Sequence, residues 1–149
     1  MARLVAIGPD EGAALRDRVR SEGALRTLET GLGYAVSTLF ICEALLANGG
    51  LHVAIDPRLP NSHVDAGLRA LEEAGVRELV EFYADRSEAV LPRLLADGRR
   101  FDLAFMDGNH RFEGVFLDLI YAGRLHEWVV LRTGTHEAFE RPFDSFVDF

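Results

Sequence analysis

Short apolar runs alternate with segments of helical periodicity along most of the chain. The runs predict strands at 25–30, 51–56, 80–84, 101–106 and 128–131. Between them, apolar residues recur at helical spacing, which predicts helices at 36–48, 64–74, 87–95 and 112–125, with an earlier helix between Asp10 and Gly23. Glycine pairs and prolines, such as Gly49-Gly50 and Pro57, mark several of the boundaries.

This alternation of strands and helices predicts an α/β fold. We expect a Rossmann-like three-layer sandwich, with a mostly parallel twisted sheet, helices on both faces and right-handed crossovers. No internal repeat, low-complexity stretch or linker interrupts the pattern. A chain of 149 residues is long enough for one core, so we expect a single domain over residues 1–149.

Charge and composition limit the kinds of binding partner that we expect for this chain. Lys and Arg number 16 against 24 Asp and Glu, for a net charge of −8, which disfavours nucleic acid and anionic membranes as partners. The single cysteine, Cys42, excludes an intrachain disulfide and falls in an apolar helical pattern typical of a core residue. No segment approaches the roughly 20 apolar residues of a membrane span. The first residues lack the pattern of a secretory signal, so we expect a cytoplasmic protein.

The most informative segment is the turn Glu29-Thr-Gly-Leu-Gly-Tyr-Ala35, between a predicted strand and a predicted helix. Glycines there allow a tight turn and the close approach of a ligand. A dinucleotide turn, G-x-G-x-x-G/A, would place a small residue where Val36 stands. The acid Glu29 suits a cationic cofactor such as S-adenosylmethionine, which carries no phosphate, and would repel a pyrophosphate. A strand–helix turn without a ligand is the alternative.

A second acid, Asp56, ends the second predicted strand 25 residues after Gly31. An acid at this place can accept hydrogen bonds from both ribose hydroxyls of a nucleotide cofactor. The alternative is a turn or capping residue before Pro57. Together with the glycine turn, Asp56 favours a ligand site.

Three segments in order resemble one family. They are Glu29-Thr-Gly-Leu-Gly-Tyr-Ala-Val-Ser-Thr38, Val53-Ala-Ile-Asp-Pro57 and Asp102-Leu-Ala-Phe-Met-Asp-Gly-Asn-His-Arg-Phe-Glu-Gly-Val115. The chain resembles class I S-adenosylmethionine-dependent methyltransferases, in the branch whose fourth strand ends in an "IDGDH-x-Y-E-G" segment. That branch includes many bacterial small-molecule O-methyltransferases. The resemblance covers residues 25 to about 125.

The resemblance implies cofactor contacts after each of the first four strands. The turn and the helix start would hold the methionine part, the end of the second strand the ribose, and the residues after the third strand the adenine. The residues so assigned are Glu29, Gly31, Gly33, Ser37, Thr38, Asp56, Asp85, Arg86, Ser87 and Asp107.

The same resemblance places Asp107 and His110 at the transferred methyl group and the acceptor. A neutral imidazole at His110 could take the proton of a hydroxyl as its oxygen attacks the methyl group. Asp107 could orient His110, face the cation or bind a metal, and a magnesium ion there stays open. A capping Asp and an exposed loop His are the alternatives. No two histidines have helical i, i+4 spacing, so zinc is not expected.

The chain departs from the family after the fourth strand. The family pattern continues with a fifth parallel strand, a helix and an antiparallel hairpin, whereas here Leu125 leads almost at once to Trp128–Leu131. We therefore expect reduced C-terminal strands, with Trp128–Leu131 beside the fourth strand and antiparallel to it. An acceptor side left open could be covered by a second copy, because the tail holds four phenylalanines, or those residues pack on their own domain.

The sequence is compatible with three functions. The first is methyl transfer from S-adenosylmethionine to a hydroxyl of a small molecule. The second is a degenerate, non-catalytic domain that still binds this cofactor, and the third is a nicotinamide-dependent oxidoreductase, which the turn spacing and Glu29 disfavour. The sequence does not identify the methyl acceptor.

Overall fold

The structure is a computed structural model, and it describes residues 7–60, 62–106, 126–132 and 138–142. The described strands form one six-stranded sheet in the order β3-β2-β1-β4-β5-β6. They are β1 (Arg26–Thr30), β2 (Leu51–Ile55), β3 (Val80–Tyr83), β4 (Phe101–Met106), β5 (His126–Arg132) and β6 (Ala138–Pro142). The strands from β1 to β5 run parallel to their neighbours, and β6 is antiparallel to β5. The α/β prediction is confirmed.

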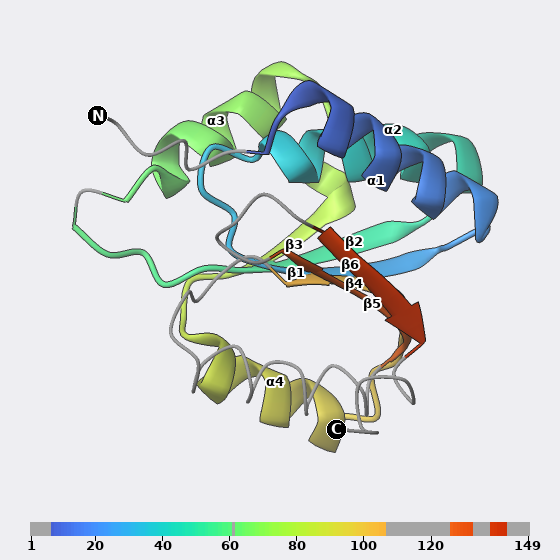
Figure 1. The fold of residues 1–149 in the computed structure, drawn as a ribbon. Helices are drawn as coiled ribbons and strands as arrows, with labels where there is room; N and C mark the ends of the chain where they lie inside the picture. The colour runs from blue at the N-terminus through green and yellow to red at the C-terminus, as the bar shows by residue number, and fades with distance from the viewer. Residues whose placement is uncertain (1–6, 61, 107–125, 133–137, 143–149) are drawn as a thin grey trace.

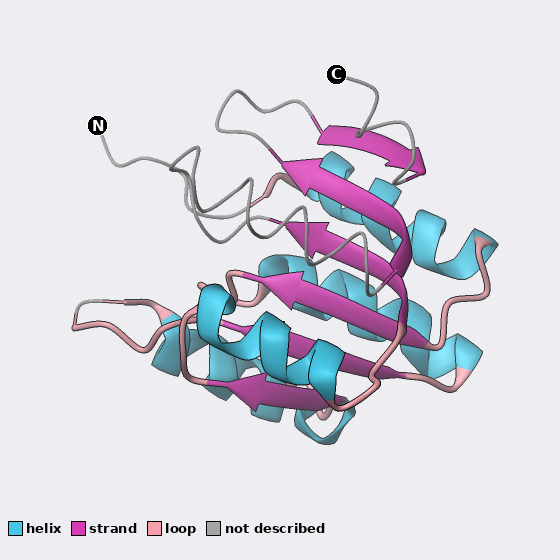
Figure 2. Cartoon of the chain, turned by 90° about the horizontal axis from the view of Figure 1, so that it is seen from below, coloured by secondary structure: helices cyan, strands magenta, loops and turns pink. Residues whose placement is uncertain are grey.

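Helices cover both faces of this sheet (Figure 1). The helices α1 (Pro9–Ser21), α2 (Val36–Asn48) and α3 (Val64–Glu73) lie on one face, and α4 (Ser87–Ala96) lies on the other. A short 3₁₀ helix, Arg77–Leu79, leads into β3. Seen from the side of α4, the strands fan out with the twist of an open parallel sheet (Figure 2). This arrangement is the predicted three-layer sandwich.

Neighbouring residues of β4 pack into different hydrophobic clusters on the two faces of the sheet. In β4, Leu103 and Phe105 pack with α1 and α2, whereas Ala104 and Met106 pack with α4. A strand buried on both faces needs apolar residues on both sides, which explains why the last four residues of β4 are all apolar. A third cluster joins α2, α3 and the first part of β3 around Leu71.

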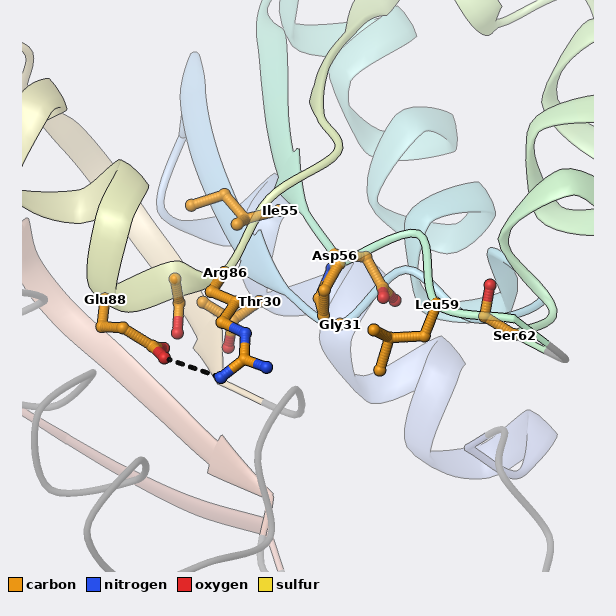
Figure 3. Close-up of a pocket in the computed structure, with 10 residues that line it drawn as sticks. Thr30, Gly31, Ile55, Asp56, Leu59, Ser62, Arg86 and Glu88 are labelled. Carbon is orange, nitrogen blue, oxygen red and sulfur yellow. Dashed lines mark ion pairs between the residues drawn. The ribbon is translucent and has the colours of Figure 1, made fainter.

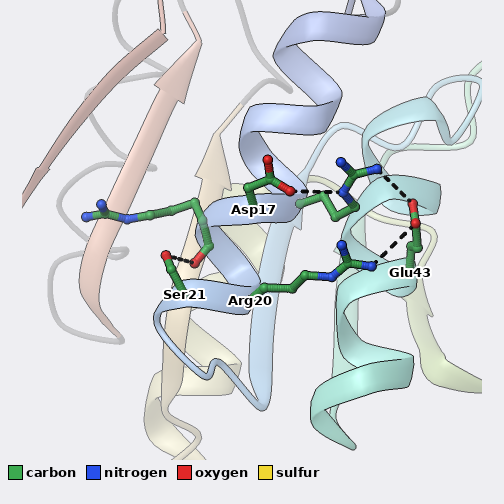
Figure 4. A network of polar contacts seen from close by, with 6 residues as sticks. Asp17, Arg20, Ser21 and Glu43 are labelled. Carbon is green, nitrogen blue, oxygen red and sulfur yellow. Dashed lines mark hydrogen bonds and ion pairs between the residues drawn. The ribbon is translucent and has the colours of Figure 1, made fainter.

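The first helix packs closely against the second at a glycine, and exposed ion pairs lie at the edge of this contact. Gly12 lies so close to the ring of Phe40 that a Cβ at residue 12 would come within 2.2 Å of it. On the surface of the same contact, Arg16 and Arg20 each reach Glu43 of α2 at 3.4 Å (Figure 4). Ion pairs this exposed contribute little to stability, so the close approach at Gly12 and its apolar neighbours hold α1 in place.

The structure corrects one prediction about the C-terminal strands. Trp128–Leu131 lies within β5, and its predicted place beside β4 is confirmed. Its predicted antiparallel direction is wrong, because β5 runs parallel to β4, with Leu103 opposite Trp128. Residues 107–125 separate the two strands, and this exceeds the length of about a dozen residues that a parallel crossover requires. The segment therefore fills the place of the fifth parallel strand that the family pattern expects.

The predicted helix at 112–125, Asp107, His110 and most of the phenylalanine-rich tail lie outside the described residues. Within the described residues, β6 is the antiparallel strand that follows β5, where the family pattern would show a hairpin of two. None of the helices among the described residues combines the length and the apolar character that crossing a membrane would require.

Candidate functional site

The turn after β1 owes its shape to residues with positive φ. Gly31 and Gly33 adopt φ values of 90° and 50°, and Ala35, the N-cap of α2, adopts 63°. Ala35 is the non-glycine residue with positive φ among the described residues. Its methyl group is fully buried against the cluster around α3. The chain therefore reverses within five residues and directs the N-terminus of α2 toward the carboxyl ends of the strands.

The side chain of Asp56, directly after β2, accepts hydrogen bonds from the backbone of this turn. Oδ2 of Asp56 accepts the N–H of Leu32 at 2.7 Å and the N–H of Gly33 at 3.1 Å. Partial burial raises the pKa of the Asp56 carboxyl, and these two backbone hydrogen bonds oppose that rise. The carboxylate thus occupies the N–H groups that a phosphate would use in a dinucleotide turn.

Glu29, on β1, binds the first turn of α2, which directly follows the same glycine turn. Its side chain is fully buried, and the hydroxyls of Ser37 and Thr38, in the first turn of α2, donate to its two carboxylate oxygens. Nε2 of His52, on β2, lies 3.2 Å from Oε1 of Glu29, and Nδ1 lies 2.7 Å from the hydroxyl of Thr27. The N-cap Ala35 has no side chain that could cap α2, so the charge of Glu29 serves the positive end of that helix instead.

A cavity of about 420 Å³ opens at the carboxyl ends of β1 and β2 and at the start of α4 (Figure 3). The lining residues are Thr30, Gly31, Ile55, Asp56, Pro57, Leu59, Ser62, Arg86, Ser87 and Glu88. The sheet order reverses between β1 and β4, and ligands of open α/β sheets bind at such a switch point. The volume is in the range of small-molecule sites.

The end of the cavity at α4 carries an ion pair. Arg86, directly before α4, points toward Glu88, and the two side chains lie 3.7 Å apart (Figure 3). Asp85 is engaged elsewhere, because its carboxylate accepts the backbone N–H of Arg86 at 2.8 Å and lies 3.3 Å from the guanidinium of Arg93. Asp85 therefore shapes the loop, and Arg86 faces the cavity.

The structure brings some of the predicted site residues to the cavity and places others behind it. Gly31, Asp56, Arg86 and Ser87 line it. The lining set does not include five of the predicted residues, namely Glu29, Gly33, Ser37, Thr38 and Asp85, which instead support the turn or the loop. Asp107 and His110 lie outside the described residues, so their roles stay predictions.

Sequence reasoning missed several lining residues and one buried partner. The missed lining residues are Thr30, Ile55, Pro57, Leu59, Ser62 and Glu88. Most of them are neighbours of predicted residues, so the position at a strand end was the available signal. The sequence analysis did not single out His52, although a polar side chain in a strand buried on both faces signals a buried partner.

The residues described by the structure contain no group of three or more His, Cys, Asp or Glu side chains placed to hold a metal ion. The magnesium alternative at Asp107 falls outside this part of the chain.

Comparison with known proteins identifies the family. Residues 28–135 match the family described as a methyltransferase domain. The chain belongs to this methyltransferase family. The matched region begins in β1 and extends just beyond β5, so it contains the glycine turn, Asp56 and the cavity. The family resemblance predicted from the three sequence segments is confirmed.

Curated and solved relatives agree with this family. The chain is 30% identical over 109 residues to caffeoyl-CoA O-methyltransferase 2 of Zea mays, a match that covers 71% of this chain and 40% of that protein. The O-methyltransferase TomG of Streptomyces achromogenes, solved with S-adenosylmethionine, is 29% identical with a TM-score of 0.76 over 85% of this chain and 56% of that one. An O-methyltransferase of Bacillus cereus, solved with S-adenosylhomocysteine, shares the fold at 21% identity, with a TM-score of 0.75 over 86% of this chain and 58% of that one. The chain thus spans about half the length of the relatives it matches.

Proposed function

We propose that this chain binds S-adenosylmethionine in the cavity at the ends of β1 and β2, and that the protein transfers the methyl group to a hydroxyl of a small molecule. The observation that carries the proposal is the position of Asp56, which lines the cavity while its Oδ2 holds the turn. Among the described residues, the hydrogen bonds to Asp56 all end on Oδ2, so Oδ1 is left to accept a ribose hydroxyl.

The charges around the turn favour this cofactor over a nicotinamide dinucleotide. Glu29 beneath the turn and Asp56 beside it attract the sulfonium and ammonium groups of S-adenosylmethionine. A pyrophosphate would need the N–H groups of Leu32 and Gly33, which Asp56 already occupies, and it would meet the carboxylate of Asp56. The chemical character of the site therefore fits the cation.

We assign the adenine to the end of the cavity near α4. Ile55 and Leu59 offer apolar contact, and Arg86 and Ser87 offer polar groups at the entrance. The methionine part then extends past Gly31 toward the N-terminus of α2, where the glycine lets the ligand approach the backbone. Gly33, Ser37, Thr38 and Glu29 support this end of the site from behind, and Asp85 supports the adenine loop.

Asp107 and His110 remain our proposed residues for the reaction. When bound, S-adenosylmethionine supplies an electrophilic methyl group on its sulfonium. His110 accepts the proton that the acceptor hydroxyl gives up, and Asp107 orients His110, faces the cation or holds a metal ion. In β4, Met106 pairs in register with Thr30, a cavity residue, and Asp107 is next in the chain.

The acceptor is a small molecule in this proposal. The curated relatives are caffeoyl-CoA O-methyltransferases, which makes caffeoyl-CoA the first acceptor to test. The net charge of −8 disfavours nucleic acid as the acceptor. The homodimer expected from the tail stays a prediction, which light scattering at micromolar concentration checks.

The first experiment measures thermal melting with S-adenosylhomocysteine (SAH) and, separately, with NAD. A ligand that binds only the folded state at about 100 times its dissociation constant adds about 2.7 kcal/mol to the stability. For a chain of this size we expect a rise of roughly 5–10 °C with SAH and none with NAD. A rise with NAD alone, or with neither ligand, contradicts the proposed cofactor.

The second experiment tests methyl transfer. The protein is incubated with methyl-labelled S-adenosylmethionine and an acceptor panel that begins with caffeoyl-CoA, and label in the product is measured. We expect transfer that depends on His110, with His110→Ala as the comparison. Binding of SAH without transfer to any acceptor would favour the degenerate cofactor-binding domain.

A further inference from the structure

One buried polar network occupies the otherwise apolar face of the sheet beneath α2. It consists of Thr27 and Glu29 on β1, His52 on β2, and Ser37 and Thr38 on α2. All five side chains are buried, and among residues 7–106, whose side chains the structure describes apart from residue 61, they account for every buried polar side chain except Thr30. A buried polar network that is fully hydrogen-bonded fixes one arrangement of its members.

The strand register explains how His52 enters this network. Thr27 of β1 pairs with His52 of β2, so their side chains emerge side by side on the face of the sheet that α2 covers. The imidazole then reaches two residues along β1 to Glu29, with Nδ1 at Thr27 and Nε2 at Glu29. His52 therefore links the two strands that end at the cavity.

The neutral imidazole with its proton on Nε2 satisfies both contacts. A carboxylate only accepts, so the nitrogen facing Glu29 must carry the proton. In that tautomer Nδ1 is an acceptor, and the hydroxyl of Thr27, which lies 2.7 Å away, can donate to it. In this arrangement the hydroxyl of Thr27 favours the tautomer that serves Glu29, as the outer partner of a catalytic or metal-binding histidine does.

We propose that His52 is a positioning residue for cofactor binding, which holds Glu29 so that Glu29 can fix the first turn of α2 and the glycine turn before it. The proposal rests on the proposed binding of S-adenosylmethionine. His52 is completely buried and is not among the residues that line the cavity. Any effect of His52 on cofactor affinity must therefore pass through Glu29 and the turn.

Three substitutions of His52 separate this role from simple packing. The side-chain amide of Gln reaches the position of Nε2 and can donate to Glu29, whereas the amide of Asn reaches only the position of Nδ1. Below the melting temperature of each variant, we expect His52→Gln to bind SAH within about threefold of the unmodified protein. We expect His52→Asn and His52→Leu to bind at least roughly tenfold more weakly, because a hydrogen bond to a charged group is lost.

A second pair tests the tautomer. Thr27→Val removes the hydroxyl that donates to Nδ1, and Thr27→Ser keeps it. We expect the weaker SAH binding only in Thr27→Val. We also expect the ¹⁵N spectrum of the unmodified protein to show His52 with its proton on Nε2, and an Nδ1-protonated ring would overturn the proposal.

A measurement without cofactor keeps this inference separate from the proposed function. We expect the backbone amide signals of Gly31 and Gly33 in the free protein to shift in His52→Asn and to stay near their positions in His52→Gln. If the unmodified protein does not bind SAH but this pattern holds, the proposed cofactor is wrong and the positioning of the turn stands. If SAH binds and all His52 variants bind it equally, with only their melting temperatures lowered, His52 is a packing residue and the inference fails.

Discussion

Asp56, at the end of β2, accepts the backbone N–H of Leu32 in the turn after β1 at 2.7 Å. The neighbouring strand thus determines the shape of the turn, together with Glu29, which binds the first residues of α2. Two acids from adjacent strands hold the two ends of one short segment. The site is therefore organised before a cofactor enters, which lowers the cost of ordering on binding.

We predict that Asp56→Ala destabilises the protein by about 1–3 kcal/mol and abolishes the SAH-induced rise in melting temperature. The substitution leaves the N–H groups of Leu32 and Gly33 without their acceptor in a partly buried turn. Urea denaturation measures the free energy of unfolding. The matched control is Asp65→Ala, since Asp65 pairs with Arg58 on the surface, and we expect a change below about 0.5 kcal/mol. Equal losses in the two variants would contradict the role of Asp56.

Asp56→Asn separates the two roles of this carboxylate. The carbonyl oxygen of Asn can accept both N–H groups of the turn, so we expect most of the stability to return. In place of Oδ1, Asn has an NH₂ group, which donates hydrogen bonds and cannot accept one from a ribose hydroxyl. We therefore expect SAH binding to stay weak, as measured by calorimetry. Full recovery of affinity in Asp56→Asn would remove the ribose from our assignment.

The affinity for SAH should also fall at acid pH. Burial raises the pKa of Asp56 above its ordinary value, so the free protein takes up this proton at a higher pH than an exposed aspartate would. Since the ligand requires the carboxylate, its dissociation constant should increase as the pH falls through that raised pKa. Titrations from about pH 7 to about pH 4 measure this change. An Asp56→Asn variant should show a flatter profile, and an identical profile would assign the effect to another group.

The same shift has an opposite consequence for stability. Because the folded pKa of Asp56 is raised, the folded state binds more protons than the unfolded state between the two pKa values, and this contribution to stability is lost as the pH rises through them. Glu81 behaves in the reverse way, because its hydrogen bond from Arg99 lowers its pKa, and its contribution is lost as the pH falls. Binding must therefore be measured where the protein remains folded.

The sequence predicted the fold and the place of the site because these depend on local patterns. The apolar residues at the end of β4 and the acid at the end of β2 both lie at positions that an α/β sheet defines by itself. The orientation of Glu29 was harder to predict. Thr27 and Glu29 share the face toward α2, while Leu28 between them faces α4, so Glu29 lies under the turn.

Other features depend on strand pairing that no local pattern reveals. The partnership of His52 with Glu29 follows from the register of β1 and β2, which places Thr27 opposite His52. The direction of β5 depends on the path of the chain after β4, and the residues of Trp128–Leu131 are equally compatible with either direction.

Cys42 gives a test of how closed the core beneath this network is. Burial raises the pKa of its thiol to about 12, with the charge of Glu29 as a lesser cause, and the side chain is completely buried. Its thiolate fraction at neutral pH is about a thousandfold below that of a thiol with the ordinary pKa of 9.0. We predict no reaction with a thiol-specific chromogenic reagent in the folded protein and one equivalent after denaturation. Rapid labelling of the folded protein would show that this part of the core opens readily.

The contact between α3 and the glycine turn gives the last prediction. A Cβ at Gly67 would lie 2.3 Å from the carbonyl oxygen of Gly33 and 3.2 Å from the backbone nitrogen of Ala35. Helix propensity alone predicts that Gly67→Ala stabilises α3 by about 1 kcal/mol. The collision is with backbone, which cannot move aside without moving the turn. We therefore expect a net destabilisation of roughly 1–2 kcal/mol and weaker SAH binding.

Gly8→Ala is the matched control, because Gly8 has an ordinary φ of −73° and nothing lies within 4 Å of a Cβ placed there. As Gly8 is the N-cap of α1, we expect a loss of less than about 1 kcal/mol and unchanged affinity for SAH. The comparison separates a general effect of replacing glycine from displacement of the turn. If Gly67→Ala were more stable than the unmodified protein and bound SAH normally, α3 could move away from the turn freely, and the turn would not depend on that contact.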